Sequence, residues 1–235
     1  MLEIINFSKT YRGGKKAVDN LTLHVEPGVI YGFIGHNGAG KTTTIRAAVG
    51  ALEFEEGDIL VNGISIKKDP IAAKRVLAYI PDTPELYNNL TGIKYLRFIA
   101  DVFGVTESER RERIEHYAGA FEMTKQLGDP ISSYSHGMRQ KLIVISALLH
   151  EPKLLVLDEP FVGLDPKAAF TLKGFMREVC DKGGAIFFST HVLDTAEKLC
   201  DRVAIIKQGR LVAEGTMDEV RGNESLEHVF LELTD

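Results

Sequence analysis

The sequence predicts an α/β protein whose core is interrupted by a helical insertion. The first third contains short segments of branched and aromatic residues that are typical of strands. The stretch from 91 to 150 carries helix signals and no strand signal, and strand and helix signals alternate after it. Strands that alternate with helices are typical of a parallel sheet covered by helices. We therefore expect two halves of one α/β core with helices inserted between them.

The first third is expected to be mainly β-structure. Gly, Pro and Asn punctuate its apolar segments, as at strand ends. The expected strands are 2–7, 21–26, 29–35, 58–63 and 76–81. A helix from Lys41 to about Leu52 is expected between the third and fourth strands.

The insertion is expected to begin with an amphipathic helix. Thr91 is a suitable N-cap, and Gly104 would end the helix. Its apolar face is expected to carry Ile93, Leu96, Ile99 and Val102. The charged run 107–121 predicts a second, solvent-facing helix.

The last third returns to alternating strands and helices. Asp165 and Pro166 are expected to open a helix, because Pro is favoured at the first helical position. A further helix is expected to run through Cys200, and a hairpin is expected around Gly209. The strands expected before this hairpin are 154–158 and 184–190.

The composition bounds the possible functions. At 235 residues and 44% hydrophobic, the chain can bury one sizeable core. A net charge of -5 disfavours a broad cationic surface, so no nucleic-acid partner is expected. No run of about 18 apolar residues and no secretion signal occurs, so we expect the chain to stay in the cytosol. Cys180 and Cys200 lack partners at metal spacing, which predicts free thiols.

The run from Phe33 to Thr44, FIGHNGAGKTTT, predicts a phosphate-binding loop. Two glycines five positions apart are followed by Lys41 and Thr42, with an apolar strand before the loop and a helix after it. Glycines allow backbone N–H groups to approach phosphate oxygens, and the helix N-terminus favours anions. The alternative is a glycine-rich turn that matches by chance, with a probability of roughly one in a hundred. The expected nucleotide contacts are Gly35, His36, Asn37, Gly38, Ala39, Gly40, Lys41, Thr42 and Thr43.

Two acidic residues follow a buried strand. Asp158 ends the apolar run 154–157, at the edge where open α/β sheets bind their ligands. We expect Asp158 and the Thr42 hydroxyl to bind Mg²⁺, and Glu159 to act as the base. Alternatively, the two residues are a turn acid and a helix-start acid before Pro160.

Together these motifs resemble those of the ATP-binding subunits of bacterial ABC transporters, over nearly the whole chain. The run YSHGMRQK, with Ser135 and Gly137, stands where that family has its signature sequence. The resemblance implies a P-loop NTPase with a RecA-like core, an N-terminal antiparallel β subdomain and an inserted α-helical subdomain. It implies one domain, with residues 1–81 and 151–235 as the core and 82–150 as the helical subdomain.

The resemblance also implies roles for single residues. Tyr11 would stack on adenine, or it is a surface Tyr near a hairpin. His191 would contact the γ-phosphate, with Lys41, at the catalytic centre. Ser135 and Gly137 would contact the γ-phosphate held by a second subunit, or they form only a turn and an N-cap. Asp82 stands where many members have Gln, and would reach the metal or its water.

The function implied by the resemblance is hydrolysis of ATP with Mg²⁺ to power transport. Two copies, or one copy and a homologous subunit, would pair around ATP. They would bind a transmembrane permease subunit at the cytoplasmic face of the cell membrane. The acidic replacement at Asp82 resembles the exporter-type, Ecs-like group, which favours export. The alternative is a soluble ABC-type ATPase that acts as a regulatory or mechanical module without transport.

The expected dock for the membrane subunit is the helical insertion. The segment 83–90, TPELYNNL, is expected to line a groove for a short cytosolic helix of that partner. Leu86, Tyr87 and Leu90 would form its apolar surface, or they belong to the core of the subdomain.

Overall fold

The N-terminal sheet is antiparallel in the computed structural model, which describes residues 1–234. Its four strands lie in the order β2-β1-β4-β5. They are β1 (Leu2–Thr10), β2 (Lys16–Val25), β4 (Glu56–Val61) and β5 (Ile64–Ser65). The expected antiparallel β subdomain is therefore confirmed, although the expected strands 29–35 and 76–81 belong to the other sheet.

The second sheet forms the parallel core. Its six strands lie in the order β10-β9-β3-β8-β7-β6, and only β10 runs antiparallel to its neighbour. They are β3 (Ile30–Ile34), β6 (Leu77–Ile80), β7 (Leu154–Asp158), β8 (Ala185–Thr190), β9 (Arg202–Lys207) and β10 (Arg210–Thr216). The turn between β9 and β10 has positive φ at Gln208 (49°) and Gly209 (81°), as a two-residue hairpin requires.

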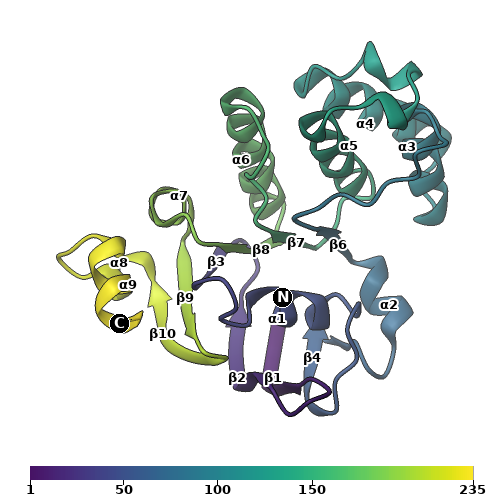
Figure 1. Cartoon of the computed structure of the whole chain (residues 1–235). Coiled ribbons are helices and arrows are strands. Elements are labelled where there is room, and N and C mark those ends of the chain that lie inside the picture. The colour runs from purple at the N-terminus through teal and green to yellow at the C-terminus, as the bar shows by residue number, and fades with distance from the viewer. Residues whose placement is uncertain (235) are drawn as a thin grey trace.

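Helices cover both faces of the parallel sheet (Figure 1). Helix α1 contacts β4 on one side and β7 on the other, so it lies between the two sheets. The α-helices are α1 (Lys41–Ala48), α2 (Pro70–Arg75), α3 (Gly92–Val102), α4 (Glu107–Ala120), α5 (His136–Leu148), α6 (Pro166–Asp181), α7 (Leu193–Leu199), α8 (Met217–Arg221) and α9 (Leu226–Thr234). Within the described chain, no helix combines the length and apolar character needed to cross a membrane.

The core strands point alternate side chains to opposite faces of the sheet. On β8, Phe187 packs in the cluster shared with α1 and the N-terminal sheet, whereas Ile186 and Phe188 pack in the cluster shared with the other helices. Both faces are apolar because the sheet is covered on both sides. Polar side chains occur where these strands end: Asp158 is the last residue of β7, and Thr190 is the last residue of β8.

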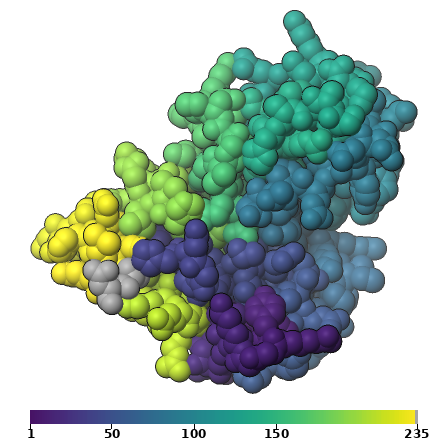
Figure 2. Space-filling view, viewed as in Figure 1, coloured from purple at the N-terminus to yellow at the C-terminus, as the bar shows by residue number. Residues whose placement is uncertain are grey.

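Helices α3, α4 and α5 form a lobe, teal in Figure 2, above the first strands, and their apolar side chains share one buried cluster with the parallel sheet. Thr91 caps α3 as expected. The expected apolar face was wrong at Val102, which is 62% exposed. Successive steps of three residues drift around a helix of 3.6 residues per turn, and nine residues bring Val102 opposite Ile93. Helix α1 also ends earlier than expected, at Ala48, followed by Gly50 with φ 66°.

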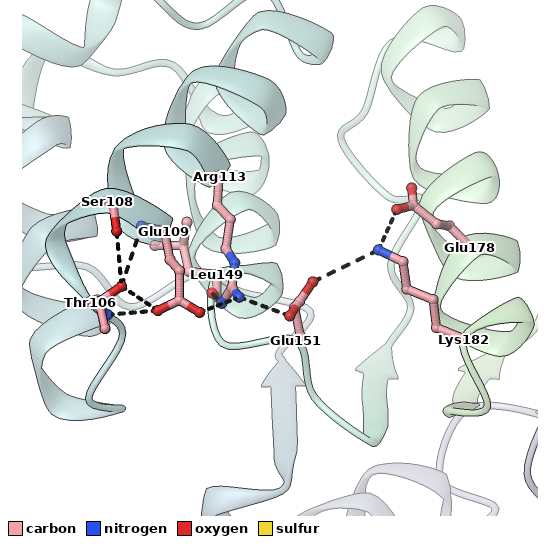
Figure 3. Close-up of polar contacts among 8 residues, drawn as sticks. All are labelled: Thr106, Ser108, Glu109, Arg113, Leu149, Glu151, Glu178 and Lys182. Carbon is pink, nitrogen blue, oxygen red and sulfur yellow. Dashed lines mark hydrogen bonds and ion pairs between the residues drawn. The ribbon is translucent and has the colours of Figure 1, made fainter.

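A run of polar contacts joins this lobe to the core, as Figure 3 shows. Arg113 of α4 donates to Leu149 O at 2.7 Å and to Glu151 Oε2 at 2.9 Å. Glu151 also lies 3.8 Å from Lys182 Nζ, which pairs with Glu178 on α6 at 2.8 Å. The helical lobe and α6 are thus connected through the segment that enters β7.

Candidate nucleotide-binding site

The loop between β3 and α1 is built on glycines. A Cβ at Gly35 would meet Ile206 O at 2.6 Å, so only glycine fits there. Gly40 has φ 113°, and a Cβ on it would meet Ala17 O at 2.7 Å. The loop therefore lies against β2 and β9 and leads directly into the N-terminus of α1. The first N–H groups of an α-helix have no partner within the helix, which makes this end suitable for an anion.

Lys41 is enclosed by the loop that precedes it. Its side chain is 6% exposed, and Nζ donates to Gly35 O at 2.6 Å and to His36 O at 3.4 Å. Nζ also lies 3.6 Å from Glu159 Oε1. The ammonium group of Lys41 thus lies between the glycine-rich loop and Glu159, which follows β7.

Asp158 is buried at the carboxyl end of β7. Ser189 Oγ donates to Asp158 Oδ1 at 2.5 Å, and Thr42 lines the same cleft as this carboxylate. Burial raises the pKa of Asp158 above its usual range; the hydrogen bond from Ser189 and the nearby Thr42 hydroxyl oppose this shift, and the charges of Asp82 and Glu159 add to it. The negative charge of this carboxylate is therefore only partly compensated.

Glu159 turns away from the strand and meets His191. Its φ of 46° lies in the left-handed region, which non-glycine residues adopt rarely. Glu159 Oε1 lies 2.9 Å from His191 Nδ1. Since a carboxylate can only accept, Nδ1 carries the proton in this contact. Glu159 therefore touches two groups expected at the catalytic centre, Lys41 and His191.

One cleft collects most of the predicted site. Its lining comprises Tyr11, Lys15, Ala17, His36, Asn37, Gly38, Gly40, Lys41, Thr42, Thr43, Asp82, Asp158 and Glu159. Tyr11 is 41% exposed, and its hydroxyl lies 3.2 Å from Thr43 Oγ1. Gly35, Ala39 and His191 are not part of this lining, although Gly35 O accepts from Lys41 Nζ and His191 Nδ1 contacts Glu159 Oε1. Three carboxylates and one buried ammonium thus face the same space.

Ser135 and Gly137 lie outside the lining of this cleft. Ser135 is the N-cap of α5, and its Oγ accepts from Met138 N at 3.3 Å. A Cβ on Gly137 would lie 3.1 Å from Gly163 O, and a Cβ on Gly163 would meet the His136 ring. The signature-like segment therefore packs on the loop that follows Glu159.

Sequence reasoning missed two features of the site. Ser189 contacts both acidic residues, but a single serine within an apolar strand gave no signal. Phe230 of α9 packs against the loop residue His36, with ring centroids 4.7 Å apart. Because about 190 residues separate His36 from Phe230 in the sequence, no local pattern could predict this contact.

The chemistry of the cleft fits a divalent cation. Asp158 Oδ2 is buried and has no hydrogen-bond partner among the described residues. An unsatisfied buried carboxylate oxygen is costly, and a bound cation would satisfy it. Carboxylate and hydroxyl oxygens are the ligands that Mg²⁺ prefers. Thr42, Asp158 and Asp82 are the residues that could hold it.

Known proteins are similar to this chain in sequence and in fold. The sequence profile of the family described as "ABC transporter" matches residues 18–162. The ABC-type transporter ATP-binding protein EcsA of Bacillus subtilis is 38% identical over 220 residues, which cover 92% of this chain and 89% of EcsA.

Two solved structures are similar along almost the whole chain. One, titled "Structure of ATP binding subunit of ABC transporter", has a TM-score of 0.96 and 38% identity and covers 100% of both chains. The other is cbiO1 from Clostridium perfringens, described as part of the ABC transporter complex cbiONQ. It has a TM-score of 0.80 and 25% identity, covering 94% of this chain and 90% of cbiO1.

Proposed function

Because this chain belongs to the ABC transporter family, as an ATP-binding subunit with ATPase activity, we propose that it powers export through a separate membrane subunit. ATP-driven pairing of two copies would supply the motion. The observation that carries the proposal is that Glu159, which lines the cleft, contacts both Lys41 of the glycine-rich loop and His191.

For hydrolysis, Glu159 polarises the attacking water. Its carboxylate lies between Lys41 and His191, and both of these can stabilise negative charge on the transferred phosphoryl group. Binding of a triphosphate would place its charge beside Lys41 and compete with the carboxylate for the ammonium group. Glu159 is then freed to face the water.

Mg²⁺ is the proposed cofactor, held by Thr42 and Asp158 with Asp82 nearby. It would offset the charge of the β- and γ-phosphates when bound. Asp82 lines the cleft, and its Oδ1 accepts from Thr83 N at 2.7 Å. An ionised Asp accepts hydrogen bonds and cannot donate them, so Asp82 suits contact with a cation or its water.

The adenine base is proposed to stack on Tyr11. The ring is partly exposed at the mouth of the cleft, and its hydroxyl reaches Thr43 in the loop. Stacking on an aromatic ring contributes about 1 kcal/mol. Tyr11 would therefore add modest affinity without deciding whether ATP binds.

A second copy is proposed to complete each site. Ser135 is the N-cap of α5, and a hydroxyl together with the side-chain-free Gly137 at a helix N-terminus makes a small anion site. This site is not part of the chain's own cleft. Two copies arranged head to tail would bring each Ser135 to the partner's γ-phosphate.

The membrane subunit is proposed to dock on the helical lobe, taken as residues 82–150 against a core of 1–81 and 151–235. Tyr87 is 60% exposed and packs edge-on against Phe98, which is 45% exposed. Leu86 and Leu90 instead pack against the core cluster. Tyr87 and Phe98 therefore remain as the apolar contact, and the chain would lie at the cytoplasmic face of the membrane through this partner.

The test is reconstitution with the membrane subunit that co-purifies from native membranes. We expect ATP-dependent export from the cytoplasmic side in proteoliposomes, and none with Glu159→Gln. Tyr87→Glu should keep ATPase activity and lose co-purification. Ile71→Glu, an apolar residue on α2 that is 68% exposed, is the matched control and should keep both. ATPase activity of a chain that co-purifies with no membrane subunit from native membranes would instead favour the soluble regulatory or mechanical module.

A further inference from the structure

A buried hydroxyl joins the two acidic residues of the cleft. Ser189 is 0% exposed near the end of β8. Its Oγ donates to Asp158 Oδ1 at 2.5 Å and accepts from Glu159 N at 3.1 Å. One hydroxyl thus both donates and accepts, to Asp158 at the end of the neighbouring strand β7 and from Glu159 directly after it.

The register of the parallel sheet creates this contact. Asp158 and Ser189 are the last paired residues of β7 and β8. The chain then turns at Glu159, whose φ of 46° takes it out of the strand conformation. The N–H group of Glu159 donates to the Ser189 hydroxyl. This side-chain hydrogen bond follows directly after the last backbone pair of the two strands.

The turn sends two neighbouring carboxylates in different directions. Asp158 stays buried beside Thr42, whereas Glu159 reaches Lys41 and His191. The conformation of Glu159 is unfavourable by itself, so contacts around it must hold it in place. Ser189 supplies one contact to each side of this turn.

We propose that Ser189 is a positioning residue for ATP hydrolysis, whose hydroxyl fixes the turn between Asp158 and Glu159 and thereby aims Glu159. This inference rests on the roles proposed above for Asp158 and Glu159. A misplacement of about 1 Å at a reacting group can reduce a rate about a hundredfold. Loss of the hydroxyl is therefore expected to act on kcat.

Ser65 provides a matched control elsewhere in the protein. It is 9% exposed on β5, and its Oγ donates to Asp58 Oδ1 at 2.8 Å and accepts from Lys68 N at 3.3 Å. The same two kinds of hydrogen bond are therefore lost in Ser65→Ala. A merely structural effect of removing a buried serine hydroxyl would appear in both variants.

The experiment compares steady-state phosphate release and equilibrium ATP binding by Ser189→Ala, Ser189→Thr, Ser65→Ala and Glu159→Gln. We expect Ser189→Ala to lower kcat about 10- to 100-fold while the Kd for ATP changes less than about threefold. Ser189→Thr keeps the hydroxyl and should recover most of the rate. Ser65→Ala should lower Tm and leave kcat within about twofold.

The outcomes separate this inference from the proposed function. If Glu159→Gln abolishes hydrolysis and Ser189→Ala keeps kcat within about twofold, the role of Ser189 is overturned and the site stands. An equal loss of kcat in Ser65→Ala and Ser189→Ala would also overturn it. If Glu159→Gln retains the wild-type rate, the proposed catalytic role of Glu159 fails first.

Discussion

His191 Nδ1 lies 2.9 Å from Glu159 Oε1, and the two residues directly follow the adjacent parallel strands β8 and β7. The contact exists because β7 and β8 pair in register up to Asp158 and Ser189. Residues one or two positions beyond this pair then face each other across the edge of the sheet. The proposed base and the proposed γ-phosphate contact are therefore held in one unit.

Glu159→Gln should separate binding from hydrolysis. Gln keeps the shape, and its Oε1 can still accept from His191, but it cannot accept a proton from water. We expect kcat to fall by about a hundredfold or more, with ATP binding retained. Phosphate release and equilibrium binding measured on the same preparation test this. A variant that still hydrolyses ATP at the wild-type rate would assign the base elsewhere.

Pairing of two copies should depend on Ser135. In the Glu159→Gln background, ATP is expected to shift the chain from monomer to dimer in size-exclusion chromatography with light scattering. Adding Ser135→Arg should prevent the shift, since a large cation replaces the small hydroxyl at the helix start. Ser133→Arg is the control, because Ser133 is also exposed but only bonds locally to Pro130 O. A monomer in every case would contradict the two-copy arrangement.

Removal of the divalent cation should lower the rate of ATP hydrolysis as much as removal of the negative charge of Asp158. Asp158→Asn keeps the hydrogen bond from Ser189 but gives up the negative oxygen that has no partner among the described residues. We expect hydrolysis to fall about a hundredfold in this variant and after chelation of Mg²⁺ in the wild type. Restoring Mg²⁺ should rescue only the wild type. Full activity in the presence of a chelator would argue against a metal at this carboxylate.

Stability should depend on pH through His150. Its Nε2 lies 3.1 Å from Leu77 O, its ring stacks on Phe103, and burial lowers its pKa, with the nearby Arg113 charge adding to the shift. Above pH of about 6.5 the residue is neutral in both folded and unfolded chains and has no effect. Below it, the unfolded chain binds the proton more readily, so the free energy of unfolding should decrease as pH falls.

His150→Asn is the test of this pH effect. The variant should be less stable at pH 7, because the stacking on Phe103 is lost. Its denaturant midpoint should fall less than that of the wild type between about pH 7 and 5. Equal slopes in the two proteins would show that His150 does not contribute.

The sequence predicted that Lys41, Thr42, Asp158 and Glu159 belong to one site, and these four residues line the same cleft, while their roles remain predictions. Lys41, Thr42, Asp158 and Glu159 are recognisable because each belongs to a short motif beside an apolar strand, where local order fixes position. The contacts of Ser189 with Asp158 and Glu159 could not be predicted, since they depend on the register between β7 and β8. Likewise, nothing near Gly163 in the sequence reveals that it lies against the ring of His136.

For the fold too, the local elements were predictable from the sequence and the long-range pairing was not. The alternation of strands and helices, the cap at Thr91 and the hairpin at Gly209 all depend on neighbouring residues. The order of strands in the two sheets depends on pairing between distant segments, which no window of the sequence contains. The exposed position of Val102 shows that a pattern of every third residue does not define one face of a helix.

The loop around Lys41 is proposed to bind the phosphates of ATP. Equilibrium binding of Mg-ATP to the folded chain tests it most directly, with Lys41→Ala beside Lys67→Ala, because Lys67 Nζ also donates to two backbone carbonyls, Glu55 O and Gly57 O. We predict that Lys41→Ala weakens binding about 10- to 100-fold, equivalent to a charged hydrogen bond of about 1.5 to 3 kcal/mol, and that Lys67→Ala does not. Equal affinity of the wild type and Lys41→Ala, with both proteins folded, would contradict the account.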